Sequence, residues 1–106
     1  MVAMKDIKNL SGVIARKFRP GKIVLFGSYA RGRPTADSDV DILVVMPYNQ
    51  GSVRKSAEIR LALRTQFPVD VLVRSPEEIK RRLAMGDSFI ESVLRDGKVL
   101  YEADDE

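Results

Sequence analysis

The chain has 106 residues, enough for one domain with one hydrophobic core and too few for a second. It has no cysteine and no histidine, which excludes disulfide bonds, thiolate zinc sites, imidazole metal ligands and histidine acid–base catalysis. The net charge is +3, but four acids lie in the last five residues, so residues 1–101 carry 18 basic and 11 acidic side chains, a balance that favours phosphate-bearing ligands or acidic partners.

The first half of the chain is expected to form one helix and two strands. Apolar residues recur at helical spacing over residues 4–18, before a proline–glycine pair, and predict an amphipathic helix. The apolar runs 22–26 and 40–46 predict strands. Between them, residues 27–32 are expected to make a single helical turn, followed by a loop over residues 33–38.

The second half is expected to add three helices, one strand and a last extended segment. Ser52 is the predicted cap of a helix that runs to Phe67, in which Val53, Ala57 and Leu61 form one apolar stripe. Beside it lie Ile59, Leu63 and Phe67. A proline ends that helix before the next apolar run. The remaining expected elements are a strand over 69–73, a helix from a Ser-Pro-Glu-Glu capping box to about residue 85, a short helix from residue 87 or 88, and an extended segment over 98–101.

Connection lengths indicate how the strands pair. A full helix joins the second and third strands, as a right-handed parallel crossover requires, whereas the short link between the first two favours antiparallel pairing. The sequence therefore predicts an α/β (α+β) fold with a small mixed sheet flanked by helices. The single domain is expected over residues 1–101, followed by an acidic tail over residues 102–106.

Three carboxylates lie where a fold normally places only apolar side chains. Gly27-Ser28 is followed after ten residues by Asp39-Val40-Asp41, and Asp70 lies in a second apolar run. The predicted strand pairing brings all of these to the same end of the sheet. Ionised groups in such a setting are costly unless they are paired or bind metal, which makes the three aspartates candidates for function.

Each candidate residue has a chemical reason for its place. Gly27 lets the backbone approach a phosphate closely, and the Ser28 hydroxyl and the amides of the following turn can donate to phosphate oxygens. Asp39 and Asp41 can bridge two Mg²⁺ ions in an in-line phosphoryl or nucleotidyl transfer. Asp70 can hold the metal that activates the acceptor hydroxyl, or take its proton. Oxygen-only ligands suit Mg²⁺, with Mn²⁺ as the second choice.

Nearby polar residues complete the expected nucleotide site. Arg31 and Arg33 can balance charge on a departing pyrophosphate, although exposed surface charge explains them about equally well. Ser38 is included with the nucleotide-binding residues, and the simpler interpretation of its hydroxyl is a bond to loop backbone. Tyr29 and Tyr48 can stack on a base, but partial burial is the favoured interpretation.

Residues 27–32 together with residues 38–41 resemble the signature of the nucleotidyltransferase superfamily of DNA polymerase β and kanamycin nucleotidyltransferase. Within it, the short length, Asp70 in its strand and the ending over residues 93–102 resemble the minimal nucleotidyltransferases. The resemblance implies that Asp39, Asp41 and Asp70 are the metal-binding catalytic triad, and that Gly27 and Ser28 hold the triphosphate of ATP.

The resemblance also implies a partner. Minimal nucleotidyltransferases typically accompany a small helical HEPN ribonuclease toxin and silence it by transferring AMP from ATP to one of its tyrosines, which would make this chain an antitoxin. Two alternatives stay open: nucleotidylation of a small-molecule hydroxyl such as an antibiotic, and a non-catalytic antitoxin that acts by binding alone. The apolar stripes of the last helices could serve docking, a homodimer or packing on the sheet.

Two further expectations concern surroundings. No apolar run approaches the roughly 20 residues of a membrane span and the start lacks a signal-peptide core, so a cytoplasmic protein without membrane contact is expected. Direct nucleic-acid binding is not expected, because no run of basic and aromatic residues is available to hold a strand.

Overall fold

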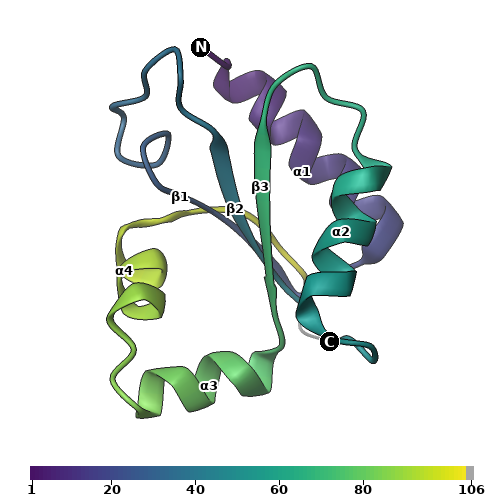
Figure 1. The fold of residues 1–106 in the computed structure, drawn as a ribbon, viewed down its shortest axis with the longest axis vertical. Coiled ribbons are helices and arrows are strands. Elements are labelled where there is room, and N and C mark those ends of the chain that lie inside the picture. Colours follow the sequence, from purple (N-terminus) through teal and green to yellow (C-terminus); the bar gives the residue numbers. More distant parts are fainter. Residues whose placement is uncertain (105–106) are drawn as a thin grey trace.

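The computed structural model describes residues 1–104 (Figure 1). None of the helices in this part of the chain is both long and apolar enough to cross a membrane. Within the described residues, helices and strands follow one another in this order: α1 (Met4–Phe18), β1 (Lys22–Phe26), β2 (Val40–Val45), α2 (Ser52–Ala62), β3 (Val69–Arg74), α3 (Pro76–Ala84), α4 (Ser88–Asp96) and β4 (Lys98–Glu102).

The strands form one mixed sheet in the order β3-β2-β1-β4. β2 and β3 are parallel and are connected through α2, while β1 pairs antiparallel with β2 on one side and with β4 on the other. The predicted pairing is confirmed in both respects, and the extended segment predicted at the end of the chain is the fourth strand. The fold is the expected mixed sheet with flanking helices.

Helices cover both faces of the sheet (Figure 1). On one face, α1 and α2 bury the main core, which contains the helix residues Ile7, Leu10, Ile14 and Ile59 together with strand residues such as Ile23, Leu25 and Ile42. On the other face, α3 and α4 pack over a smaller cluster centred on Val24, Leu43 and Val93. This second face is less completely covered, because Phe26, Val45 and Leu72 remain only partly buried there.

Helix α2 is shorter than the sequence predicts. It ends at Ala62 rather than Phe67, and its N-cap is Gly51, with no side-chain capping bond from Ser52. The chain leaves the helix because Leu63 adopts an extended conformation, which lets Leu63 and Phe67 pack on the main core. Tertiary burial thus overrides the helical propensity of residues 63–67.

The predicted stripe on α2 is also wrong in part. Val53 and Leu61 are 81% and 84% exposed, whereas Ile59 is fully buried. The stripe that faces the sheet is therefore the one that passes through Ile59, and the two exposed residues lie on the solvent side.

The two short helices on the second face have defined starts. The Ser75 hydroxyl accepts a hydrogen bond from the Glu78 amide at 3.1 Å, as the capping box predicts. The Glu78 side chain does not complete the box; it pairs with Arg81 and with Arg82 instead. At the start of α4, the Asp87 carboxylate accepts from the Ile90 amide at 3.1 Å.

The sheet extends one residue into the segment predicted as tail. Glu102 lies in β4 opposite Lys22, and their charged groups are 3.7 Å apart. The Ala103 amide then donates to the Gly21 carbonyl at 2.9 Å. Residues 105 and 106, which belong to the predicted tail, lie outside the described residues.

Candidate active site

The three candidate carboxylates gather at one end of two neighbouring strands. Asp41 is the second residue of β2, Asp70 is the second residue of β3, and the two are direct partners in the parallel register. Asp39 immediately precedes β2. Asp41 is partly buried, while Asp39 and Asp70 are exposed. Asp41 and Asp70 therefore lie next to each other, as the parallel crossover predicted from the sequence requires.

Asp41 and Asp70 lie on the face of the sheet that α3 and α4 cover only in part. Side chains alternate between faces along a strand, so Asp41 shares a face with Leu43, which belongs to the smaller cluster. Cross-strand partners point to the same side, so Phe26 of β1 and Asp70 of β3 flank Asp41 there. The carboxylates are therefore open to a ligand from solvent.

The charge at this end of the sheet is not compensated. Burial raises the pKa of the Asp41 carboxyl above its ordinary value, and the negative charges of Asp70 and Asp39 raise it further. The Arg31 guanidinium acts in the opposite direction and lowers the pKa of Asp41. No ion pair within residues 1–104 involves Asp41. The four groups thus act on one another electrostatically, with an excess of negative charge.

The donor chemistry at this site fits a hard divalent cation. The chain offers only oxygen ligands here, and carboxylate oxygens suit Mg²⁺ or Mn²⁺. As the side chains lie, however, no three carboxylates among residues 1–104 are close enough together to ligate one ion. A bound cation would have to draw the exposed carboxylates of Asp39 and Asp70 toward Asp41.

Gly27 fits tightly against Asp41. Its φ of +76° lies in the left-handed region, and a Cβ at this position would come within 2.3 Å of an Asp41 carboxylate oxygen. Only glycine can therefore hold this backbone while Asp41 keeps its place. The residue that the sequence singled out for phosphate approach also makes room for the central carboxylate.

The segment after Gly27 forms the single turn that the sequence predicts. The amides of Ala30 and Arg31 both donate to the Gly27 carbonyl at 3.1 Å. Within the described residues, the amides of Ser28 and Tyr29 make no backbone hydrogen bond. These two N–H groups remain available to an anion, as at the N-terminus of a helix.

Tyr29 and Ser38 have structural roles. Tyr29 is only 6% exposed, and its hydroxyl accepts a hydrogen bond from the Val2 amide at 2.9 Å. Its ring therefore does not offer a platform for a base, in agreement with the favoured sequence interpretation. The Ser38 hydroxyl accepts from the Thr35 amide at 2.8 Å and holds the loop that leads into Asp39.

The sequence interpretation missed Asp96, the last residue of α4. A hollow of about 70 Å³ borders the Gly27 turn, and Arg31, Asp96 and Gly97 are among the residues that line it. The bidentate bond from Arg95 lowers the pKa of the Asp96 carboxyl, and the Arg31 charge lowers it further. The Arg31 charge thus acts on both Asp41 and Asp96. In the sequence, Asp96 carried no signal beyond that of a turn residue before glycine.

An aromatic pair next to Asp41 was also missed. The rings of Phe26 and Phe89 pack edge to face, with centroids 5.7 Å apart and an interplanar angle of 85°. Phe26 is the register partner of Asp41, and Phe89 is 49% exposed. An apolar wall therefore borders the carboxylates on the side of α4. The sequence placed Phe89 in an apolar stripe but could not show that it meets Phe26.

Comparison with known proteins finds a family and relatives that match most of the chain. The model of the nucleotidyltransferase domain family matches residues 7–100. The Methanocaldococcus jannaschii protein named "Putative protein adenylyltransferase MJ0604" is 36% identical over 99 residues, which cover 92% of this chain and 96% of that protein. "Putative protein adenylyltransferase MJ0141" of the same organism is 34% identical over 86 residues, covering 81% of this chain and 82% of that protein.

A solved structure shares the fold. It is described as a putative nucleotidyltransferase from Sulfolobus solfataricus and superposes with a TM-score of 0.65 at 24% identity, over 93% of this chain and 79% of that chain. The family match extends from α1 to β4, so it includes the Gly27 turn and all three aspartates. The chain belongs to the nucleotidyltransferase domain family.

Proposed function

We propose that this protein is a metal-dependent protein adenylyltransferase, which transfers AMP from ATP to a hydroxyl group of a protein acceptor. The observation that carries the proposal is the arrangement of Asp41. This carboxylate lies beside Asp70 in register and against Gly27 of the turn that is expected to bind phosphate. The names of the two Methanocaldococcus relatives support the same reaction class.

The proposed reaction is an in-line displacement at the α-phosphorus of ATP. The acceptor oxygen forms a bond to that phosphorus, the bond to the β-phosphate bridging oxygen breaks, and pyrophosphate leaves with the bonding electrons. The proton of the acceptor hydroxyl passes to the exposed Asp70 carboxylate, which acts as general base. The free amides of Ser28 and Tyr29 bind phosphate oxygens, and Arg31 offsets the charge on the leaving pyrophosphate.

Asp39, Asp41 and Asp70 would hold Mg²⁺, with two ions as the expected number and Mn²⁺ as a substitute. When bound, the metal neutralises charge on the phosphates and on the attacking and leaving oxygens. The uncompensated charge around Asp41 supports this assignment, because a cation would relieve it. Millimolar Mg²⁺ together with ATP should therefore raise the melting temperature through linkage.

The proposed acceptor is a tyrosine of a cognate HEPN ribonuclease, with this protein as its antitoxin. This finer proposal rests on the resemblance of the Asp70 strand and of residues 93–102 to minimal nucleotidyltransferases. A protein acceptor also fits the open position of the carboxylates. Asp41 and Asp70 lie on a sheet face that the helices cover only in part, so a large acceptor can approach them.

The test is direct detection of the transferred group. The protein is incubated with labelled ATP, Mg²⁺ and the product of the neighbouring gene, and the partner is analysed by intact-mass spectrometry. We expect the partner's mass to increase by one or more AMP groups. Asp41→Asn should slow the transfer by roughly 10³-fold or more, since it removes charge that stabilises the transition state.

Asp37→Asn is the matched control. Asp37 lies in the loop that leads to Asp39 and is exposed, so its neutralisation should leave the transfer rate unchanged. Modification of a small-molecule hydroxyl, with an unmodified partner protein, would replace the proposed acceptor. Full protection of cells by Asp41→Asn would instead identify a non-catalytic antitoxin.

A further inference from the structure

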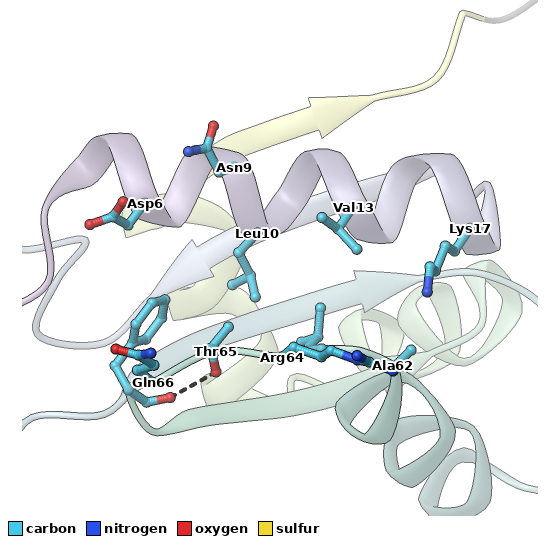
Figure 2. Close-up of a pocket in the computed structure, with 11 residues that line it drawn as sticks. Asp6, Asn9, Leu10, Val13, Lys17, Ala62, Arg64, Thr65 and Gln66 are labelled. Atoms are coloured by element: carbon cyan, nitrogen blue, oxygen red, sulfur yellow. Dashed lines mark hydrogen bonds between the residues drawn. The ribbon is translucent and has the colours of Figure 1, made fainter.

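An open pocket, called the cavity below, lies away from the carboxylates. It has a volume of about 550 Å³ and runs between α1 and the segment that follows α2 (Figure 2). This is the face of the main core, opposite the face that carries Asp41 and Asp70. The proposed transfer reaction therefore makes no use of this space.

The cavity has an apolar floor and a charged end. Leu10 and Val13 of α1 point into it, and the partly buried Leu63 and Phe67 line it from the other side. Figure 2 shows Lys17 of α1 at one end and the Arg64 side chain on the facing segment extending toward that end, while Asp6 lies at the opposite end of the helix. No ion pair within residues 1–104 involves Lys17 or Arg64. Two cations without a partner thus border an apolar surface.

The cavity exists because α2 ends early. Residues 63–67 contain neither glycine nor proline, and their sequence favours continuation of the helix. The extended conformation at Leu63 instead carries the chain along α1, and the Thr65 hydroxyl fixes this segment through a 2.9 Å hydrogen bond to the Phe67 carbonyl. A place where local preference is overridden in this way is a place to look for function.

We propose that this cavity binds a small amphipathic organic anion, with its carboxylate at Lys17 and Arg64 and its apolar body over Leu10 and Val13. The volume falls within the range of about 300–1,000 Å³ that is usual for small-molecule sites. An arginine fork can receive a carboxylate through two parallel hydrogen bonds, and the lysine adds a third donor.

The spacing along α1 sets the size of this ligand. Leu10 and Lys17 are seven residues apart, which at about 1.5 Å per residue is roughly 10 Å along the helix axis. A body of about eight carbon atoms spans that length. A straight acyl chain and an aromatic ring on a short linker both meet this requirement, so one compound of each kind is used as a probe.

Isothermal titration calorimetry of the full chain with octanoate and with phenylbutyrate tests the proposal. We expect saturable binding of at least one of them, and little binding of octanamide or octylammonium, which share the apolar body but lack the negative charge. The stronger of the two acids identifies the type of apolar body. Because this measurement needs neither ATP nor an acceptor, its outcome does not depend on the proposed transferase activity.

Charge-neutralising variants locate the binding site. Lys17→Gln and Arg64→Gln should each weaken binding of the acid by about tenfold or more, since each removes a charge-assisted hydrogen bond. Lys5→Gln and Arg60→Gln are the matched controls: both residues are exposed and belong to α1 and α2, but neither lines the cavity. They should leave the affinity unchanged.

A variant that fills the cavity provides a second route. Val13→Phe places a larger side chain in the cavity and should abolish binding while the far-ultraviolet circular dichroism spectrum is retained. The proposal is overturned if neither acid binds saturably, if octanamide binds as tightly as octanoate, or if Arg64→Gln and Arg60→Gln bind alike.

Discussion

Substitution of Gly27 by alanine separates two effects that the structure places at one residue. The first is conformational, because a non-glycine residue in the left-handed region costs about 1–2 kcal/mol. The second is steric, because the new Cβ would lie 2.3 Å from an Asp41 carboxylate oxygen and 3.2 Å from its Cγ. Asp41 has to move to relieve that contact. We expect Gly27→Ala to lower the Tm by about 4–8 °C for each kcal/mol of stability that it loses, and to abolish AMP transfer.

Gly32→Ala is the control that isolates the steric effect. Gly32 has a φ of +73°, almost the same as Gly27, but a Cβ there would meet nothing within 4 Å. Both variants should lose the conformational part of the stability in urea unfolding, and Gly27→Ala should lose more because of its contact with Asp41. Only Gly27→Ala should lose activity. Wild-type transfer by a folded Gly27→Ala protein would refute the idea that the turn fixes the position of Asp41. Equal loss of activity in both variants would point to the turn conformation instead.

Four further predictions concern stability. Gly97→Ala should lower the free energy of unfolding by about 1–3 kcal/mol through overpacking, since its Cβ would lie 2.4 Å from the Val93 carbonyl oxygen and 2.9 Å from that of Leu25. Gly12→Ala in α1 should instead raise the urea midpoint slightly, because only the flexible end of Arg16 is near the new Cβ. Asp41→Asn should raise the urea midpoint of the metal-free protein at neutral pH, because the raised pKa of Asp41 means that its charge opposes folding; a lowered midpoint would contradict the electrostatic account. Hydrogen bonds from the Ile90 amide and then from Arg82 hold the pKa of the Asp87 carboxyl below its ordinary value of 3.8, so the stability that its charge contributes is present above that pH and is lost as the pH falls through the lower folded-state pKa. Asp87→Asn retains the cap, so its urea midpoint should decline less than that of the wild type as the pH falls below about 5. An equal decline in both proteins would contradict the role assigned to the Asp87 charge.

The sequence predicted the sheet because its signals were local. Short continuous apolar runs defined the strands, and the lengths of the links between them decided which pairs are parallel. The predicted end of α2 was wrong because the signal that ends this helix is not local. Nothing in residues 63–67 forbids a helix, and the chain leaves it only because Leu63 and Phe67 reach the main core. Such packing depends on α1, which lies more than 40 residues earlier in the chain.

In the candidate site, too, some residues could be placed from the sequence and others depend on tertiary packing. The positions of Asp41 and Asp70 followed from topology, because two residues at equivalent places in adjacent parallel strands become register partners. The approach of Asp96 to Arg31, and of Phe89 to Phe26, depends on how α4 docks on β1. Gly97 permits that docking because a Cβ there would lie 2.9 Å from the Leu25 carbonyl oxygen, a requirement that the sequence shows only as a glycine after a helix.

The folded chain leaves Asp41 unfavourably charged, which would favour binding of a cation at this site. A partly buried carboxylate with two acidic neighbours opposes folding, and Arg31 offsets the charge only in part. An uncharged residue at position 41 would relieve this repulsion, since the register partner and the Gly27 turn hold the backbone in place without it. Local strain of this kind is expected where a protein maintains a binding site at the expense of stability. The exposed carboxylates of Asp39 and Asp70 can then move toward an ion, and binding it would convert the repulsion that destabilises the free protein into affinity for the metal and its nucleotide.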